Sequence, residues 1–168
     1  MTPRAFAGSS HRAYDEFHRA MLALAGLPLL ERIEAANQLP PRMLAGHPLL
    51  LVFAPSCGKF LKSVGRSEAT RDAMKCLVAL RRWELAGKGL SPDLDLEEVA
   101  RAAGMAEVPR DPFRRDGGPL RLVVRQGEPI VYSIGLDGQD HGGSIDSNLG
   151  DKPLGDYLYR LNPSDSGR

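Results

Sequence analysis

Several features that would place a protein in a class at once are missing from this chain of 168 residues. Its formal net charge is only +1, so there is no electrostatic reason to expect nucleic acid or an acidic substrate as its ligand. The longest apolar run, residues 48–55, is far too short to span a bilayer. No early apolar stretch follows the first basic residues, as it would in a signal peptide. We therefore expect a soluble chain that does not itself insert into a membrane.

The signatures of common enzyme classes are also missing. The chain has no G-x-S-x-G motif, no phosphate-binding Walker loop and no dinucleotide fingerprint. Its two cysteines, Cys57 and Cys76, would lie about 28 Å apart on one continuous helix, beyond the reach of a disulfide. Cys57 stands between Ser56 and Gly58 with His47 nearby, but a cysteine in an apolar segment is normally inert. We read both cysteines as small buried hydrophobic residues.

Helices come first along the chain. Apolar periodicity and caps predict a frayed N-terminus followed by three shorter helices, from Ser9 or Ser10 onward, from Leu29 to Gln38, and from Leu96 to Ala103. The segment that starts at Pro48 should kink or break near Pro55 and Gly58. Residues 1–65 are therefore predicted to form a helical N-terminal extension, ahead of a domain that covers residues 66–168.

One longer helix is predicted from Ser67, as its N-cap, to Ala86. Its apolar positions keep to one face, which predicts that this face packs on the core. Trp83 lies on the same face and is predicted to anchor the core rather than to hold a ligand. The members of this stripe are Ala69, Ala73, Cys76, Leu77, Leu80 and Trp83.

Strands follow the helices. Leu120–Arg125 and Glu128–Ile134 are rich in β-branched residues, and the Gln126-Gly127 pair between them predicts a hairpin turn. Tyr157–Leu161 is predicted to be a last strand. Helices followed by antiparallel strands indicate an α+β fold, with N-terminal helices and one long helix packed on a small antiparallel sheet.

A long acidic loop joins the last two predicted strands. It contains six glycines and five aspartates, namely Asp137, Asp140, Asp146, Asp151 and Asp156. Loops of this length are usually functional or disordered. The composition suggests that the loop wraps round a hard cation, because Ca²⁺ takes about six to eight oxygen ligands. The spacing is not that of an EF-hand, and His141 without a second histidine or a cysteine is read as an exposed loop residue rather than a zinc ligand.

Two motifs in this region point to a family. Asp111-Pro112-Phe113 is a rigid turn before the hairpin, and Tyr132-Ser133-Ile134-Gly135-Leu136-Asp137-Gly138 leads into the acidic loop. With the long helix before them and the final strand after them, they resemble the soluble part of the major pseudopilin of type II secretion. The resemblance covers residues 67–161. It implies a calcium site in which Ile134 supplies a backbone carbonyl and Asp137 and Asp156 supply carboxylates.

The chain also departs from that family. Gly155 precedes Asp156 where the family has adjacent acids, and the loop is longer, so Asp140, Asp146 or Asp151 would have to supply the missing carboxylate. The family's prepilin cleavage site and hydrophobic N-terminal helix have no counterpart in the sequence. We therefore expect a pseudopilin-type domain used in another protein, or a part separated from its membrane anchor.

The resemblance implies a non-enzymatic, calcium-stabilised module that packs against other protein subunits. It would belong to a type II secretion-like assembly or form the extracytoplasmic part of a membrane protein, in a periplasmic or other extracytoplasmic setting. Two alternatives remain open, a small metal-dependent enzyme that uses the acidic loop and an adaptor domain that binds no metal. The lack of a convergent His or Glu partner for a metal-bound water favours the non-enzymatic module over the enzyme.

Overall fold

The computed structural model describes residues 3–38, 48–146 and 154–161. The chain divides into two compact units, residues 1–64 and 65–168. The division expected from the sequence, after residue 65, differs from this one by a single residue.

The first unit is helical. It contains α1 (Pro3–Ala23), the short 3-10 helix η1 (Leu24–Gly26), α2 (Leu29–Asn37) and the first part of α4 (Pro48–Leu85). The bounds of α2 confirm the predicted second helix. The predicted start of the first helix was wrong, because α1 begins at Pro3, where the fixed φ of proline suits a first helical turn. The inner face of α2 buries Leu29, Leu30, Ile33 and Ala36.

The helix α4 corrects the sequence prediction, because it runs from Pro48 to Leu85 with no interruption. Neither the expected break near Pro55 and Gly58 nor a start at Ser67 is present. Gly58 is explained by packing: a Cβ at this position would collide with the side chain of Asn37 at the end of α2. The glycine therefore allows a close approach of two helices rather than ending one. Among the described residues, no helix combines the length and the apolarity that crossing a membrane requires.

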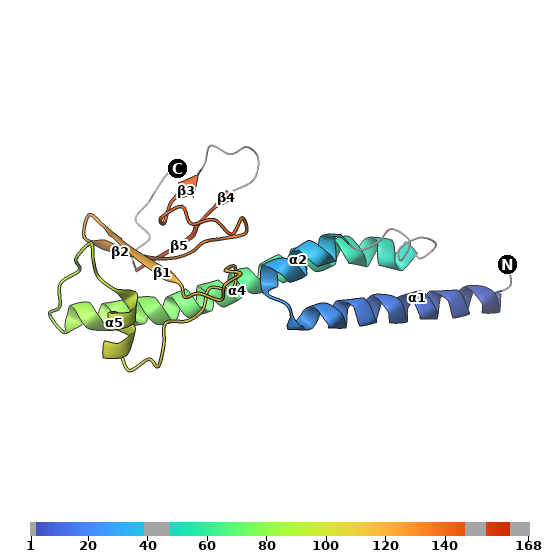
Figure 1. Cartoon of the computed structure of the whole chain (residues 1–168), viewed down its shortest axis with the longest axis horizontal. Helices are drawn as coiled ribbons and strands as arrows, with labels where there is room; N and C mark the ends of the chain where they lie inside the picture. Colours follow the sequence, from blue (N-terminus) through green and yellow to red (C-terminus); the bar gives the residue numbers. More distant parts are fainter. Residues whose placement is uncertain (1–2, 39–47, 147–153, 162–168) are drawn as a thin grey trace. The chain divides into compact units, whose positions relative to one another are not determined.

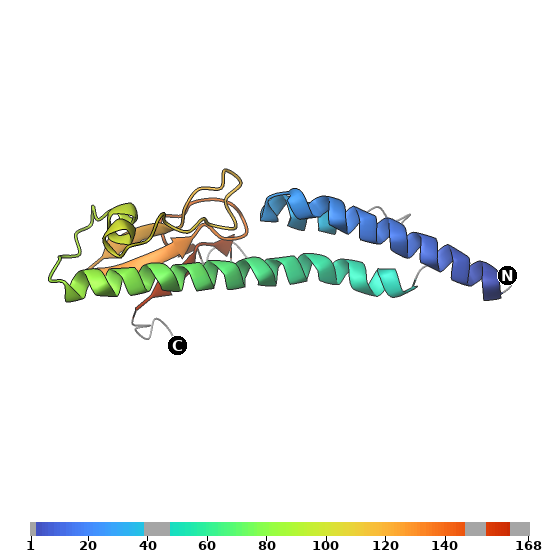
Figure 2. The ribbon, with the colours of Figure 1, turned by 90° about the horizontal axis from the view of Figure 1, so that it is seen from below.

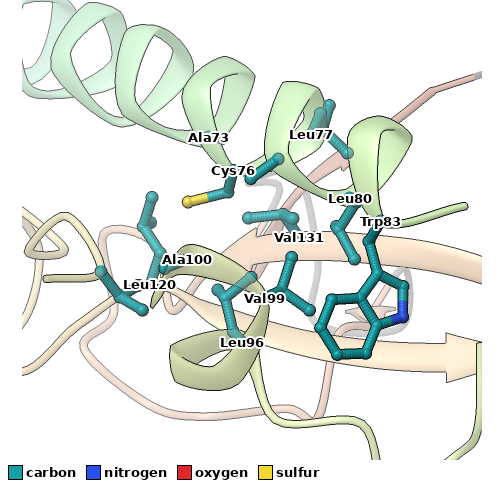
Figure 3. Packing of buried hydrophobic residues seen from close by; sticks show 12 residues of the cluster. Ala73, Cys76, Leu77, Leu80, Trp83, Leu96, Val99, Ala100, Leu120 and Val131 are labelled. Atoms are coloured by element: carbon teal, nitrogen blue, oxygen red, sulfur yellow. The ribbon is translucent and has the colours of Figure 1, made fainter. Parts of the chain in front are cut away.

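The second unit packs the remainder of α4 against α5 (Leu96–Ala102) and a sheet (Figure 1). Figure 2 shows the strands lying along one side of α4. All members of the predicted apolar stripe on α4 are buried, which confirms that this face packs on the core. Leu77 and Leu80 belong to the same buried cluster as Val131 of the sheet and Val99 of α5 (Figure 3). Trp83 is also buried, and its indole N–H donates a 3.1 Å hydrogen bond to the Gly89 carbonyl, as suits a core anchor.

The sheet has three antiparallel strands in the order β1 (Arg121–Arg125), β2 (Glu128–Ser133) and β5 (Tyr157–Arg160). The predicted hairpin is confirmed, with Arg125 opposite Glu128 and both turn residues, Gln126 and Gly127, at positive φ. Ser133 on β2 stands opposite Tyr157 on β5, so the chain leaves and re-enters the sheet at neighbouring positions. This is the predicted α+β fold, with a long helix on a small antiparallel sheet.

Candidate functional site

The acidic loop leaves the sheet at the end of β2 and returns at β5. Its two ends touch, because a Cβ on Gly135 would collide with the carbonyl oxygen of Gly155. Gly135 also has a φ of +73°, which favours glycine. Within the loop, β3 (Ile145–Asp146) pairs with β4 (Leu154–Gly155) in a short antiparallel ladder that the sequence analysis did not predict. The described part of the loop is therefore folded.

Asp156 organises the loop from its C-terminal end. Its carboxylate is buried, with an exposed fraction of 3% for the residue. It accepts hydrogen bonds from three backbone amides, those of His141 (3.3 Å), Gly143 (2.7 Å) and Ser144 (3.3 Å). Gly143 has a φ of +73°, and this glycine conformation helps to turn successive amides toward one carboxylate. Asp156 thus holds residues 141–144 beside the start of β5.

Asp137 contacts the same loop segment. One of its oxygens accepts a hydrogen bond from the Gln139 amide at 3.1 Å, and the other lies 3.0 Å from Nε2 of His141. His141 therefore contacts two of the predicted ligands, Asp137 through its ring and Asp156 through its amide. The prediction that this histidine is exposed was wrong, since its side chain is only 20% exposed. Asp137 and Asp156 therefore contact the same residue, and their sharing of a cation remains a prediction.

Asp140 is turned toward the sheet. Its carboxylate pairs with the Arg121 guanidinium and accepts hydrogen bonds from the Tyr132 hydroxyl (3.2 Å) and the Gly142 amide (2.9 Å). Burial together with the Asp140 charge raises the pKa of Tyr132, which therefore remains a neutral donor at physiological pH. Arg125 adds a 2.8 Å hydrogen bond to the Gly142 carbonyl. These contacts attach the loop to β1 and β2.

Three predicted ligands remain. Ile134 directly follows β2, is 7% exposed, and its amide donates a 2.9 Å hydrogen bond to a carboxylate oxygen of Asp111. Asp146 lies in β3, opposite Leu154, and its side chain is outside the described part of the chain. Asp151 lies wholly outside the described residues. The positions of the Asp146 and Asp151 carboxylates therefore remain predictions.

Asp111 is the residue that the sequence analysis missed. It is 2% exposed and accepts hydrogen bonds from the Phe113 amide (2.9 Å), the Ser133 hydroxyl (2.8 Å) and the Ile134 amide (2.9 Å). Burial is the largest influence on this carboxyl and raises its pKa. Phe113, next in the same turn, meets the Tyr157 ring edge-on at 5.4 Å. The turn is thereby joined to both strands that bound the acidic loop.

A local signal for this role was present in the sequence. An aspartate commonly accepts a hydrogen bond from the backbone amide two residues further on. Asp111 does so with Phe113, across the intervening proline. The bonds to Ser133 and Ile134, by contrast, join positions more than twenty residues apart in the sequence, and no local pattern predicts them.

The loop's carboxylates can bind a cation only through acceptor sites that internal hydrogen bonds do not already occupy. An ionised carboxylate has about four acceptor sites, and the described contacts occupy three on Asp156 and two on Asp137. Both therefore retain some capacity for Ca²⁺. Within the described part of the chain, however, no three His, Cys, Asp or Glu side chains are grouped as metal ligands. A complete site would need a further carboxylate, and Arg121 already neutralises that of Asp140, which leaves Asp146 and Asp151 as the candidates.

Two potential nucleophiles of the second unit, Cys76 and Ser133, are buried. Burial raises the pKa of the Cys76 thiol to about 11, so it stays protonated and unreactive at neutral pH. Ser133 is fully buried, and its hydroxyl donates to the ionisable carboxyl of Asp111 rather than lining an open cleft. Both cysteines are free thiols, as expected from their separation along the chain.

Comparison of the chain with protein-family models, with curated proteins and with solved structures yielded no match. The resemblance to the pseudopilin domain therefore rests on the two motifs and on the order of the elements around them.

Proposed function

We propose that this chain is a non-enzymatic, pseudopilin-like module that works by packing against other protein subunits, and that Ca²⁺ in the acidic loop stabilises it. The observation that supports this proposal is the meeting of Asp137 and Asp156 at His141. The two carboxylates come from opposite ends of the loop, so a shared cation would tie both ends to the sheet. The bound calcium would hold the loop in one conformation for contact with other subunits and would take part in no reaction.

The candidate ligands are the Asp137 and Asp156 carboxylates, the Ile134 carbonyl, and a carboxylate from Asp146 or Asp151. Secretion assemblies and extracytoplasmic surfaces are the settings that the resemblance implies. Such surfaces meet millimolar calcium, a concentration at which a loop of modest affinity is filled. The proposed partners are other protein subunits of a type II secretion-like assembly or of a membrane protein to which this module belongs.

A second candidate function, an adaptor domain that binds no metal, is favoured by one specific observation. Each of the three described loop carboxylates already accepts hydrogen bonds from amides or pairs with a cationic or neutral side chain of the same unit. Such a loop can fold without a metal ion, because its negative charges have internal donors. The two candidates differ in one measurable property, the dependence of stability on calcium.

The test is thermal unfolding of the full chain in chelator and in millimolar calcium, with magnesium as the control ion. A ligand at a hundredfold excess over its Kd adds about 2.7 kcal/mol to the stability of the folded state. For a domain of this size that corresponds to a rise in Tm of roughly 5–11 °C. Magnesium should raise Tm less, because it demands octahedral geometry and gives up water reluctantly.

Two variants make the test specific. Asp137→Ala should abolish the calcium-dependent rise in Tm, while Asp93→Ala, which removes an exposed aspartate outside the loop, should retain it. Equal Tm values for the wild-type chain in chelator and in calcium would refute the calcium site and leave the metal-free adaptor as the better proposal.

A further inference from the structure

The outer face of α4 in the second unit carries apolar residues that the core does not use. Met74 and Val78, one helical turn apart, have exposed fractions of 54% and 50%. Together with Met105, which follows α5, they line a groove of about 430 Å³. Exposed apolar groups that are gathered in a groove and bordered by polar residues mark interaction sites more often than scattered ones do. Two of the three are methionines, whose flexible side chains adapt to different partners.

Three cationic residues also line this groove. Arg71, Lys75 and Arg82 line it, and none of the described residues that line it is acidic. Arg71 and Lys75 share one carboxylate, that of Asp72, which offsets one of their two charges. Arg82 makes no ion pair within the described part of the chain. The groove therefore carries about two uncompensated positive charges beside its apolar residues.

We propose that this groove, lined by Met74, Val78 and Met105 together with Arg71, Lys75 and Arg82, binds an amphipathic helix of a partner protein that carries Asp or Glu beside its apolar stripe. From Arg71 to Arg82 the α4 surface extends over about three helical turns, or roughly 16 Å. That length suits the apolar anchors at i, i+3 or i+4, and i+7 of a helix lying in a groove. Carboxylates beside the apolar stripe of such a helix would meet the three cations.

The same features make other occupants less suitable. Nucleic acid is bound mainly through many phosphate contacts, and the three cations of this groove supply few of them. A membrane surface is bound by a continuous apolar face along a helix, whereas the exposed face of α4 at this groove carries Arg71, Lys75 and Arg82 beside its apolar residues. This inference rests on the proposed role in packing against protein subunits, but it involves none of the loop residues.

The experiment presents a displayed library of helical peptides to the full chain. The apolar stripe of the peptides is fixed, and the flanking positions vary among Glu, Gln and Lys. We expect Glu to be enriched at the flanks, and the selected peptide to bind the wild-type chain at least roughly tenfold more tightly than its Lys counterpart. Val78→Asp should weaken this binding by roughly tenfold or more. Leu85→Asp is the matched control, because Leu85 is 72% exposed on the same helix outside the groove.

A charge reversal completes the test. Arg82→Glu should shift the preference of the flanking positions from Glu toward Lys, while its Tm stays close to that of the wild-type chain. No enrichment, enrichment of Lys or Gln with the wild-type chain, or equal binding by Val78→Asp would overturn the proposal. Self-association of the chain that Val78→Asp abolishes would overturn it in favour of a second copy, and binding to anionic vesicles without peptide selection would assign the groove to a membrane.

The two proposals can fail separately. Peptide binding should be unchanged in Asp137→Ala, and the calcium-dependent rise in Tm should be unchanged in Val78→Asp. If calcium does not raise Tm but the peptides are still enriched in Glu, only the loop site is refuted. If calcium raises Tm but the peptides show no enrichment, only the groove is refuted.

Discussion

Replacing Asp111 with alanine should be among the most damaging single changes in the second unit. The side chain accepts hydrogen bonds from two backbone amides and one hydroxyl, and its three partners come from the turn itself and from the end of β2. Each buried donor left without an acceptor costs about 1–3 kcal/mol. Relief of the buried charge and entry of water offset part of that sum. We expect Asp111→Ala to lower the free energy of unfolding by about 3–5 kcal/mol.

The assay is urea unfolding followed by the fluorescence of Trp83, the only tryptophan of the chain, which lies in the core of the same unit. Asp93→Ala is the matched control, because that aspartate is exposed, and it should change the free energy by no more than about 0.5 kcal/mol. A double-mutant cycle with Ser133→Ala tests the mechanism. The hydroxyl of Ser133 has no acceptor once Asp111 is gone, so the two losses should fall short of additivity by about 0.5 kcal/mol or more.

The contribution of Asp111 to the free energy of unfolding should also depend on pH. Burial raises the pKa of Asp111 in the folded state, although three donors and the charge of Arg114 act in the opposite direction. The folded state therefore binds the proton more tightly than the unfolded chain does, whose aspartates titrate near about pH 3.9. The resulting stabilisation is present below that pH and is lost as the pH rises through the folded pKa. Asp111→Asn lacks this contribution, so its destabilisation should be larger at about pH 4 than at pH 7.

Two results would refute the assignment of Asp111 as a buried anchor. A loss below about 1 kcal/mol in Asp111→Ala would show that water or another group satisfies the three donors. A destabilisation by Asp111→Asn that is the same at both pH values would show that the pKa of Asp111 is not raised in the folded state.

Three further predictions follow from the core, the thiols and the loop. Leu77→Ala should cost about 2–5 kcal/mol in urea unfolding, against no more than about 0.5 kcal/mol for the exposed Leu85→Ala, and a small loss at Leu77 would show that this face is not core. Cys76 has a pKa of about 11, so a thiol reagent near pH 8 should label it only in denaturant when the other cysteine is replaced by serine. Gly135→Ala should lower Tm more than Gly142→Ala, because both have positive φ but only Gly135 has a backbone carbonyl where its Cβ would lie; equal losses would contradict the close approach of the loop ends.

Periodicity predicted the fold well where burial follows a single face. The stripe on α4 that ends at Trp83 is buried throughout, and the hairpin turn at Gln126-Gly127 lies where its turn residues indicated. Both signals are local, since the helix and the turn each depend on residues a few positions apart. The predicted helix break at Gly58 was wrong, because the glycine makes room for the Asn37 side chain of another helix. A glycine that permits close packing and a glycine that ends a helix look alike in the sequence.

The candidate site was predicted less completely for the same reason. The resemblance to the pseudopilin loop implied Asp137 and Asp156 as a pair of ligands, and in the structure both contact His141. The ladder between β3 and β4 was missed, because two-residue strands carry no measurable alternation. The role of Asp111 was missed because two of its three donors lie beyond any local pattern.

An acidic loop need not be explained by an external cation. Asp156 faces three amides of a glycine-containing turn, Asp140 faces Arg121, and Asp137 faces His141, so these negative charges meet donors or cations of the same unit. The aspartate count in the sequence suggested a cation, but backbone N–H groups also satisfy carboxylates, and a count of charges does not include them. The case for calcium therefore depends on whether Asp146 or Asp151 adds a carboxylate that has no internal partner. If calcium raises the Tm of the wild-type chain and Asp146→Ala or Asp151→Ala reduces that rise, the substituted residue supplies the missing carboxylate. If calcium does not raise the Tm of the wild-type chain, the loop's negative charges serve only its internal hydrogen bonds and ion pairs.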